Sequence, residues 1–168
     1  MTSWRFWRKA RASEWHLSLI SVRAHGLRLR IEGYEFPNEH LDHYDANWLL
    51  ASVAVTTPRG AWSATHPCML TWEAIELGRW IYNNARASDV GDEMDFLDPL
   101  LQFKVARMTD ASVTLAVGFG LEFRPPWATP DRPDAEDYQF EFECPRETLR
   151  QEAQRFLQHL TTFPKRGR

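Results

Sequence analysis

The chain has 168 residues, of which 43% are hydrophobic and 13% are aromatic, and its formal net charge is −3. This length and composition predict one domain with a sizeable core and exclude a wholly disordered chain. No apolar run approaches the about 18 residues of a membrane-spanning helix, and no signal peptide is recognisable, so we expect a cytoplasmic protein without membrane association.

The charge is unevenly distributed along the chain. Residues 1–31 carry seven Lys and Arg against one Glu, a net charge of +6, whereas the remainder carries 13 basic and 22 acidic side chains, a net charge of −9. We therefore expect a basic N-terminal arm at 1–25, a single folded domain at 26–164 and a basic tail at 165–168. An acidic body repels phosphates, so we expect no nucleic acid. Its charge suits a basic protein partner, but a surface that serves only solubility would carry the same charge.

The first half of the chain predicts strands followed by a helix. Apolar and charged residues alternate over 27–32, which indicates a half-exposed strand. The segment 48–57 is apolar on both faces and therefore predicts a central strand, and 61–65 is a short returning strand. Thr71 is a candidate N-cap for a helix whose apolar residues recur at helical spacing as far as Ala85.

The second half predicts four more strands and a final helix. Short apolar runs and alternating segments place these strands at 94–99, 101–105, 113–123 and 138–142. Gly118 and Gly120 lie on the small-residue face of the third segment and indicate a bend or a close backbone contact. Pro145 opens the helix. Its buried stripe is expected to comprise Leu149, Ala153, Phe156 and Leu160.

Strands occur in runs rather than in strict alternation with helices. This order predicts an α+β fold with a mainly antiparallel β-sheet and two helices packed on one face.

Few residues are placed to carry chemistry. The chain has no GxGxxG, GxxxxGK[ST], GxSxG or HExxH motif, and we expect neither enzymatic activity nor a cofactor. Cys68 lies near His66, but lone thiols are more often buried structural residues, and we expect Cys68 and Cys144 to be reduced. Asp95 and Asp98 could be paired acids, although carboxylates near a proline usually form turns.

One segment offers an alternative metal site. In HLDHYD, the side chains of His40, Asp42, His43 and Asp45 are ligand types for zinc, iron or manganese, but their spacing is that of no standard site. We favour a turn that leads into the following strand, in which Asp45 and Asn47 hydrogen-bond the local backbone. We therefore expect no metal.

Five segments together resemble the WapI-type family of bacterial immunity proteins. They are IEGYEFP, YDANWLLASVAV, WSATHPCMLTWEAIELGRWI, MDFLDPLLQFKV and LEFRPPW, and the resemblance covers roughly residues 27–164. Its most recognisable element is the entry into the second strand, formed by Tyr44, Asp45, Asn47 and Trp48, with Ala46 where the family usually has glycine. The resemblance implies a structural role for this element, with Trp48 filling the core, and no catalytic residues.

The resemblance also implies a function. Proteins of this family are small cytoplasmic partners of polymorphic, contact-dependent toxins, so we expect an immunity protein that blocks a cognate toxin domain. Acidic loops at 35–45, 89–98 and 131–143 would face a basic toxin. The candidate partner-binding residues are Glu35, Glu39, Asp42, Asp89, Asp92, Glu93, Trp127, Asp131, Asp134, Glu136 and Asp137.

Two other functions remain as alternatives. The first is binding of a small ligand in a pocket formed by the Gly118 and Gly120 face and nearby Trp residues. The second is a metal-dependent enzyme that uses the HLDHYD cluster.

Overall fold

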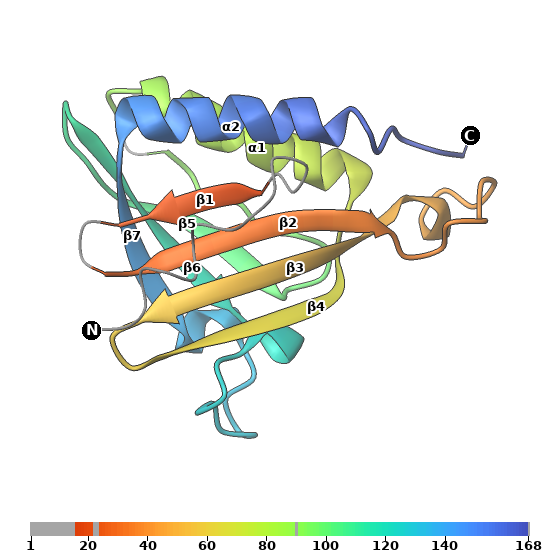
Figure 1. The fold of residues 1–168 in the computed structure, drawn as a ribbon, viewed down its shortest axis with the longest axis horizontal. Helices are drawn as coiled ribbons and strands as arrows, with labels where there is room; N and C mark the ends of the chain where they lie inside the picture. The colour runs from red at the N-terminus through yellow and green to blue at the C-terminus, as the bar shows by residue number, and fades with distance from the viewer. Residues whose placement is uncertain (1–15, 22–23, 90, 168) are drawn as a thin grey trace, which may run out of the picture.

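The computed structural model describes residues 16–21, 24–89 and 91–167. They form two antiparallel sheets and two α-helices, which confirms the predicted α+β class (Figure 1). The strands are divided between a four-stranded and a three-stranded sheet, because the last strand before the first helix does not pair with the first strand after it. Within the described part of the chain, no helix is both long and apolar enough to cross a membrane.

The first sheet is a meander in which each strand pairs with the next one along the chain. Its strands are β1 (Leu17–Ile20), β2 (Gly26–Tyr34), β3 (Trp48–Thr57) and β4 (Gly60–Leu70). Alternate residues of β2 and β3 enter the core, as Leu29 opposite Val53 illustrates. β3 occupies the predicted central position, although its outer face is only half-buried, and β4 is longer than the predicted strand at 61–65.

The second sheet has β6 at its centre. Its strands are β5 (Leu101–Met108), β6 (Ser112–Phe119) and β7 (Gln139–Pro145). The prediction that β6 continues to residue 123 is wrong, because Leu121 has a positive φ of 48° and begins a short 3₁₀ helix, η3 (Leu121–Phe123). The predicted strand at 94–99 is also absent: this segment contributes a single bridge, between Met94 and Phe103.

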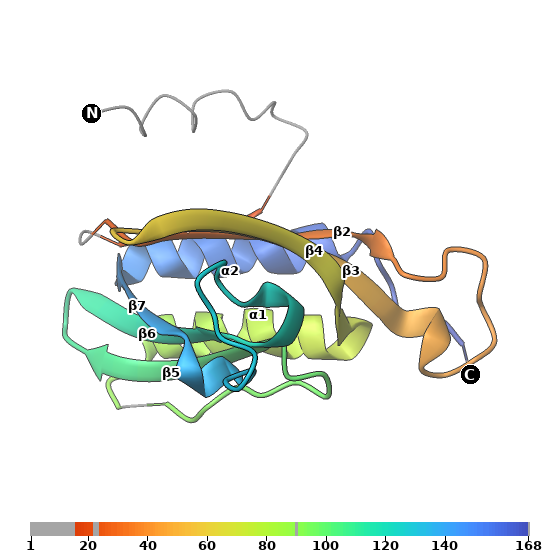
Figure 2. The same cartoon turned by 90° about the horizontal axis from the view of Figure 1, so that it is seen from below.

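The two helices are α1 (Thr71–Arg86) and α2 (Arg146–Leu160). They lie side by side and cover one open side of the space between the sheets (Figures 1 and 2). The predicted stripe of α2 is buried, and side chains from both sheets and both helices form one core. Gly78 permits the close approach of the helices, because a Cβ atom there would lie 2.7 Å from Cδ2 of Leu157.

The starts of the two helices differ from the prediction by one residue, with α1 beginning one residue earlier and α2 one residue later. Thr71 is the first residue of α1, and Leu70 is its N-cap residue. The backbone N–H of Leu70 donates to Oε2 of Glu73 at 2.8 Å, so a carboxylate in the first turn satisfies this group. Pro145 is the N-cap residue of α2 rather than its first residue.

The sheet begins before residue 26, the predicted start of the domain. β1 pairs with β2, with Leu17 opposite Leu29, and Leu17 and Leu19 are fully buried. The segment 17–20 therefore belongs to the first sheet because it has an apolar face to bury, whereas residues 1–15 of the predicted arm lie outside the described residues. At the other end, Arg166 of the predicted tail contacts the loop between β2 and β3.

Cys68 and Cys144 are free and buried, as predicted. Burial raises the pKa of both thiols, that of Cys144 to about 12. Neutral thiols are poor nucleophiles, so both cysteines act as core residues.

Candidate partner-binding surface

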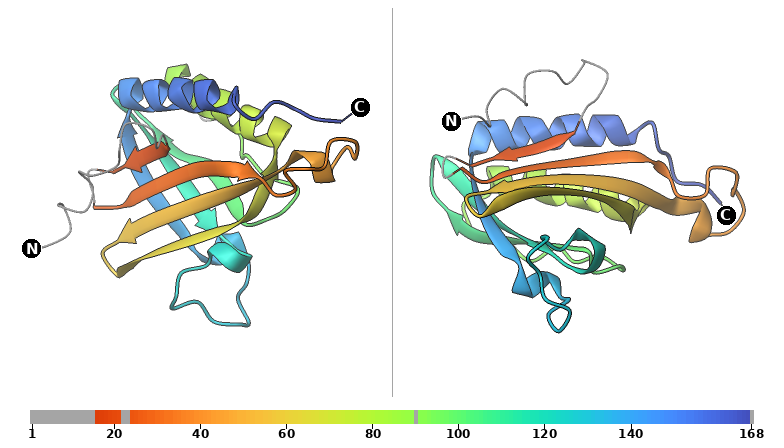
Figure 3. Two further views of the ribbon diagram at one scale, coloured as in Figure 1. Left: turned by 45° about the vertical axis from the view of Figure 1, so that its right-hand side comes forward. Right: turned by 60° about the horizontal axis from the view of Figure 1, so that its bottom comes forward.

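The loop 35–47 projects from the end of the molecule at which the C-terminus lies (Figure 3). Two carboxylates shape it from within. Asp42 Oδ1 accepts the backbone N–H groups of Tyr44 and Asp45 at 2.8 and 2.7 Å, and Glu39 Oε1 accepts that of Leu41 at 2.7 Å. These hydrogen bonds favour the charged carboxylates and lower the pKa of both groups. The predicted local turn chemistry is therefore present, but Asp42 rather than the predicted Asp45 supplies the carboxylate.

Asn47 fixes this loop to two distant parts of the chain. Its side chain is completely buried at the end of a short 3₁₀ helix, η2 (Asp45–Asn47). Asn47 Nδ2 donates to the carbonyl oxygens of His43 and Arg166, both at 2.8 Å. Its Oδ1 accepts the hydroxyl of Thr71 at 2.9 Å and the backbone N–H of Arg166 at 2.8 Å. All four hydrogen-bonding positions of the amide are thus used.

The other two residues of this element differ from the expectation. Trp48 is half-buried on the outer face of β3 and does not fill the core, since the neighbouring Leu49 occupies the inward position. Tyr44 is exposed, and its ring meets that of Trp72 at a centroid distance of 6.0 Å.

The alternative metal site is not assembled. Asp42 already binds the loop backbone, and the His43 ring stacks on Trp72 at 4.9 Å. Among the described residues, no group of three or more His, Cys, Asp and Glu side chains is arranged to hold a metal ion. The structure therefore does not favour the alternative of a metal-dependent enzyme.

The first turn of α1 holds the segment 95–99 close to the loop 35–47. Thr71 hydrogen-bonds Asn47, and Trp72 packs on His43, as described above. Glu73 is buried, and its Oε1 accepts the backbone N–H of Leu97 at 2.6 Å. Two loops that are about fifty residues apart in the sequence therefore have a fixed relative position.

Carboxylates from three parts of the chain lie close to one another around His66 of β4: the loop 35–47, the segment 95–99 and η3. Burial and the charges of Asp45 and Asp98 raise the pKa of Glu35. Burial and the charge of Glu122, on η3, raise the pKa of Asp98. His66 lowers both pKa values, and its Nε2 lies 3.9 Å from Oε1 of Glu122. These acids repel one another and are only partly compensated by the imidazole.

The segment 95–99 also borders the loop 131–137. A shallow cavity of about 420 Å³ between them is lined by Asp95, Asp134 and Glu136, together with Gln102 and apolar side chains. The segment 95–99 thus contributes to both groups of acidic residues, with Asp98 near His66 and Asp95 at this cavity. We call this surface the acidic band and define it by Glu35, Asp45, Asp95, Asp98, Glu122, Asp134 and Glu136.

The structure brings only some of the predicted acidic residues into this band. The loop that carries Asp92 and Glu93 lies along α1 and β5, where the carbonyl oxygen of Asp92 accepts Trp80 Nε1–H at 3.1 Å and Glu93 pairs with Lys104 at 3.1 Å. Asp137 pairs with Arg132 at 2.8 Å. Asp89 and Asp131 are exposed outside the band.

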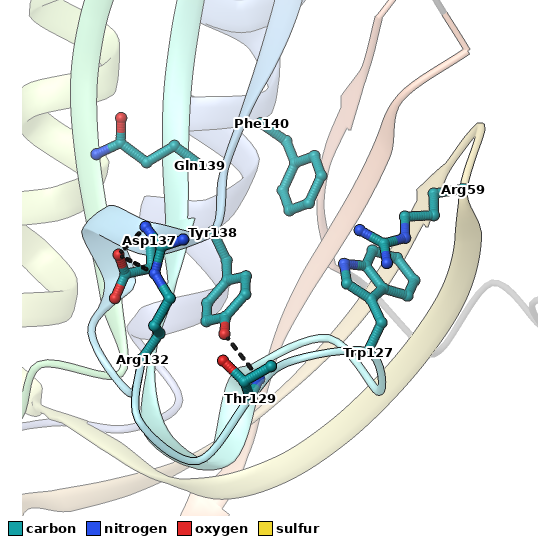
Figure 4. A pocket seen from close by; sticks show the side chains of 8 residues that line it. All are labelled: Arg59, Trp127, Thr129, Arg132, Asp137, Tyr138, Gln139 and Phe140. Carbon is teal, nitrogen blue, oxygen red and sulfur yellow. Dashed lines mark hydrogen bonds and ion pairs between the residues drawn. The ribbon is translucent and has the colours of Figure 1, made fainter.

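Trp127 lies in a second hollow, of about 430 Å³, between the β3–β4 turn and the loop 124–138 (Figure 4). The Arg59 guanidinium lies 4.8 Å from the centroid of the Trp127 ring, and Tyr138 accepts the backbone N–H of Thr129 at 3.0 Å. Trp127 is half-buried and packs edge-on against Trp62 at 5.3 Å. This predicted binding residue thus also anchors its own loop to the first sheet.

The Gly118 and Gly120 face does not form the pocket of the small-ligand alternative. A Cβ atom at Gly118 would lie 2.4 Å from the carbonyl oxygen of Ala135, and one at Gly120 would lie 2.7 Å from the backbone nitrogen of Ala135. The predicted close backbone contact is therefore correct, but the group that makes it belongs to the chain itself.

Four acidic residues of the acidic band are not among the predicted partner-binding residues: Asp45, whose predicted role was structural, and Asp95, Asp98 and Glu122. Asp95 and Asp98 were interpreted as turn formers, and Glu122 was placed on a strand. The available signal was the run of charge in DEMDFLDP, because acidic residues on a loop without a basic neighbour are exposed to a partner.

These features define a class of protein. An α+β domain that presents acidic and exposed apolar side chains on loops held by a rigid scaffold has the properties of a protein-binding domain. The chain belongs to the immunity protein WapI-like family, whose family model matches residues 18–164. Comparisons with curated proteins and with solved structures give no match.

Proposed function

We propose that this chain is a cytoplasmic immunity protein that binds a cognate toxin domain of a polymorphic, contact-dependent toxin and blocks it without enzymatic action. The observation that carries the proposal is the family match over residues 18–164. An immunity role requires recognition of a toxin, so the toxin domain is the partner that this membership implies.

The charge of the chain supports a basic partner. From residue 32 onward the net charge is −9, and the acidic band concentrates part of it on one surface. Complementary charge speeds the encounter of two proteins and disfavours wrong partners. The acidic loops and Trp127 would then lie at or beside the interface, and the bound chain would cover the functional surface of the toxin domain.

Calorimetry tests this proposal. The chain is titrated with the C-terminal domain of the toxin encoded beside its own gene, at low and at moderate salt. We expect tight binding that weakens as salt screens the charges. Neutralising Glu35, Asp98 and Glu122 together should weaken binding at low salt and reduce its salt dependence, whereas neutralising the exposed Asp110 should change neither.

The outcomes separate the parts of the proposal. Absence of binding at both salt concentrations would reject the immunity role for this toxin. Binding that neutralisation of the band leaves unchanged would reject the electrostatic mechanism but keep the immunity role.

A further inference from the structure

Exposed apolar side chains gather at one end of the molecule. Five large hydrophobic side chains are exposed in the described part of the chain, and four of them belong to the loop 35–47 and the segment 95–99. We call these four the apolar tip: Phe36, Leu41, Tyr44 and Leu97, with 43, 81, 52 and 64% of their surface exposed. Neighbouring apolar residues left in water are typical of a protein interaction site.

The apolar tip is held in place before any partner arrives. Asn47 and Trp72 fix one loop to α1, and Glu73 fixes the backbone of Leu97 to the same turn of that helix. The C-terminal segment also holds the loop 35–47 in place. The Arg166 guanidinium lies 3.4 Å from the centroid of the Tyr34 ring and donates to the carbonyl oxygen of Pro37 at 2.9 Å. A preorganised surface loses little conformational entropy on binding.

Charge indicates which partner fits the tip. Asp98 adjoins Leu97, Asp45 adjoins Tyr44, and Glu35 adjoins Phe36, so three of the four apolar residues have a band carboxylate as their neighbour in the chain. The repulsion between Glu35 and Asp98, and that between Asp98 and Glu122, would be relieved by a cation placed beside Asp98.

We propose that the apolar tip is the docking site for the toxin, and that its occupant is a basic segment that also carries apolar side chains. Apolar groups of that segment pack on Leu41, Tyr44 and Leu97, and its Lys or Arg side chains lie against Glu35 and Asp98. This inference rests on the proposed function and adds to it the position and chemistry of the interface.

Exposed-residue substitutions test the docking site. Leu41→Ser, Tyr44→Ser and Leu97→Ser are made singly and together, and binding to the neighbouring toxin domain is measured by calorimetry. The matched control is Ile20→Ser, since Ile20 is the fifth exposed hydrophobic residue and lies beside Gly26 at the opposite end of the first sheet. We expect the triple variant to weaken binding by at least about tenfold, and the control to change it by less than about twofold.

A second measurement uses the unmodified chain. Amide hydrogen exchange of the free protein and of the complex should show new protection at 36–45 and 95–99, and little change at 109–112, the turn at the other end of the second sheet. A wild-type chain that binds while the triple variant binds equally well, or protection that avoids both loops, would overturn the docking site alone. A wild-type chain that does not bind would overturn the proposed function together with the site.

Discussion

At the scale of single residues, Asn47 links the loop 35–47, the first turn of α1 and the C-terminal segment. Its amide makes four hydrogen bonds from a completely buried position. Its neighbours in YDANW have different roles, because Ala46 is buried in η2 whereas Tyr44 is exposed. One buried amide therefore determines how the proposed binding loop is presented.

Replacing Asn47 with Ala should lower the free energy of unfolding by about 2–4 kcal/mol, because buried partner groups lose their hydrogen bonds. The measurement is urea unfolding, in which the midpoint should fall without a change of slope. Asn83→Ala is the matched control, since Asn83 is exposed on α1, and it should change stability by less than about 0.5 kcal/mol. Equal stability of the two variants would show that the Asn47 network is not needed.

At the scale of secondary-structure elements, the segment around Ala135 packs directly on β6. Gly118 and Gly120 leave room for its backbone, and the N–H of Leu121 donates to the carbonyl oxygen of Pro133 at 2.8 Å. This contact places Asp134 and Glu136 beside the segment 95–99. The positions of Asp134 and Glu136 in the acidic band thus depend on the two glycines.

Gly118→Ala should destabilise the protein by about 1–3 kcal/mol, because the added Cβ atom would overlap the carbonyl group of Ala135. Gly33→Ala provides the control: Gly33 has open space around its Cβ position and should tolerate alanine with little change. Thermal unfolding of both variants compares the two sites. If Gly118→Ala were as stable as Gly33→Ala, the close packing of this segment would be refuted.

The local elements could be predicted from the sequence because they depend on local patterns. The bounds of β3 match the prediction, and the buried stripe of α2 was recognised from its helical spacing. The division into two sheets could not be predicted. Whether the strands before and after α1 pair with each other depends on tertiary packing, which local sequence patterns do not report. The end of β6 was missed for a different reason: Leu121 has a left-handed conformation that its residue type disfavours.

The candidate surface was predictable only in part. Acidic loops were expected to face a partner, and Glu35, Asp134 and Glu136 do lie in the acidic band. The role of the segment 95–99 at its centre arises from its hydrogen bond to Glu73 and from the cavity that it shares with Ala135, residues about 25 and 40 positions away in the chain. No periodicity or spacing reports contacts of that kind.

At the scale of the whole molecule, the acidic band places like charges near one another. The structure disfavours the carboxylate forms of Glu35 and Asp98, whose pKa values are raised by burial and by their acidic neighbours. A surface that binds a basic partner is expected to carry such an unfavourable arrangement in the free protein, since the partner supplies the missing charge.

Asp98→Asn should therefore stabilise the free protein at pH 7 while weakening its binding to the toxin. Because the folded-state pKa of Asp98 is raised, its ionised carboxylate lowers the free energy of unfolding. This destabilisation is fully present where Asp98 is ionised in both the folded and the unfolded protein. It is absent below the unfolded-state pKa of about 3.9. The stability gain should shrink as pH falls from 7 towards 4. Unfolding midpoints of both proteins across this range check the sign, and a wild type more stable than the variant at pH 7 would contradict it.

The most direct test of the account is the growth of bacterial cells that produce the neighbouring toxin domain together with this chain. We predict that the wild-type chain restores growth, and that a variant combining Tyr44→Ser, Leu97→Ser and Asp98→Asn fails to do so at the same protein level. A variant combining Ile20→Ser with Asp110→Asn should protect as well as the wild type. If the wild type gave no protection, or if the tip variant protected fully, the account of toxin blockade through this end of the molecule would be contradicted.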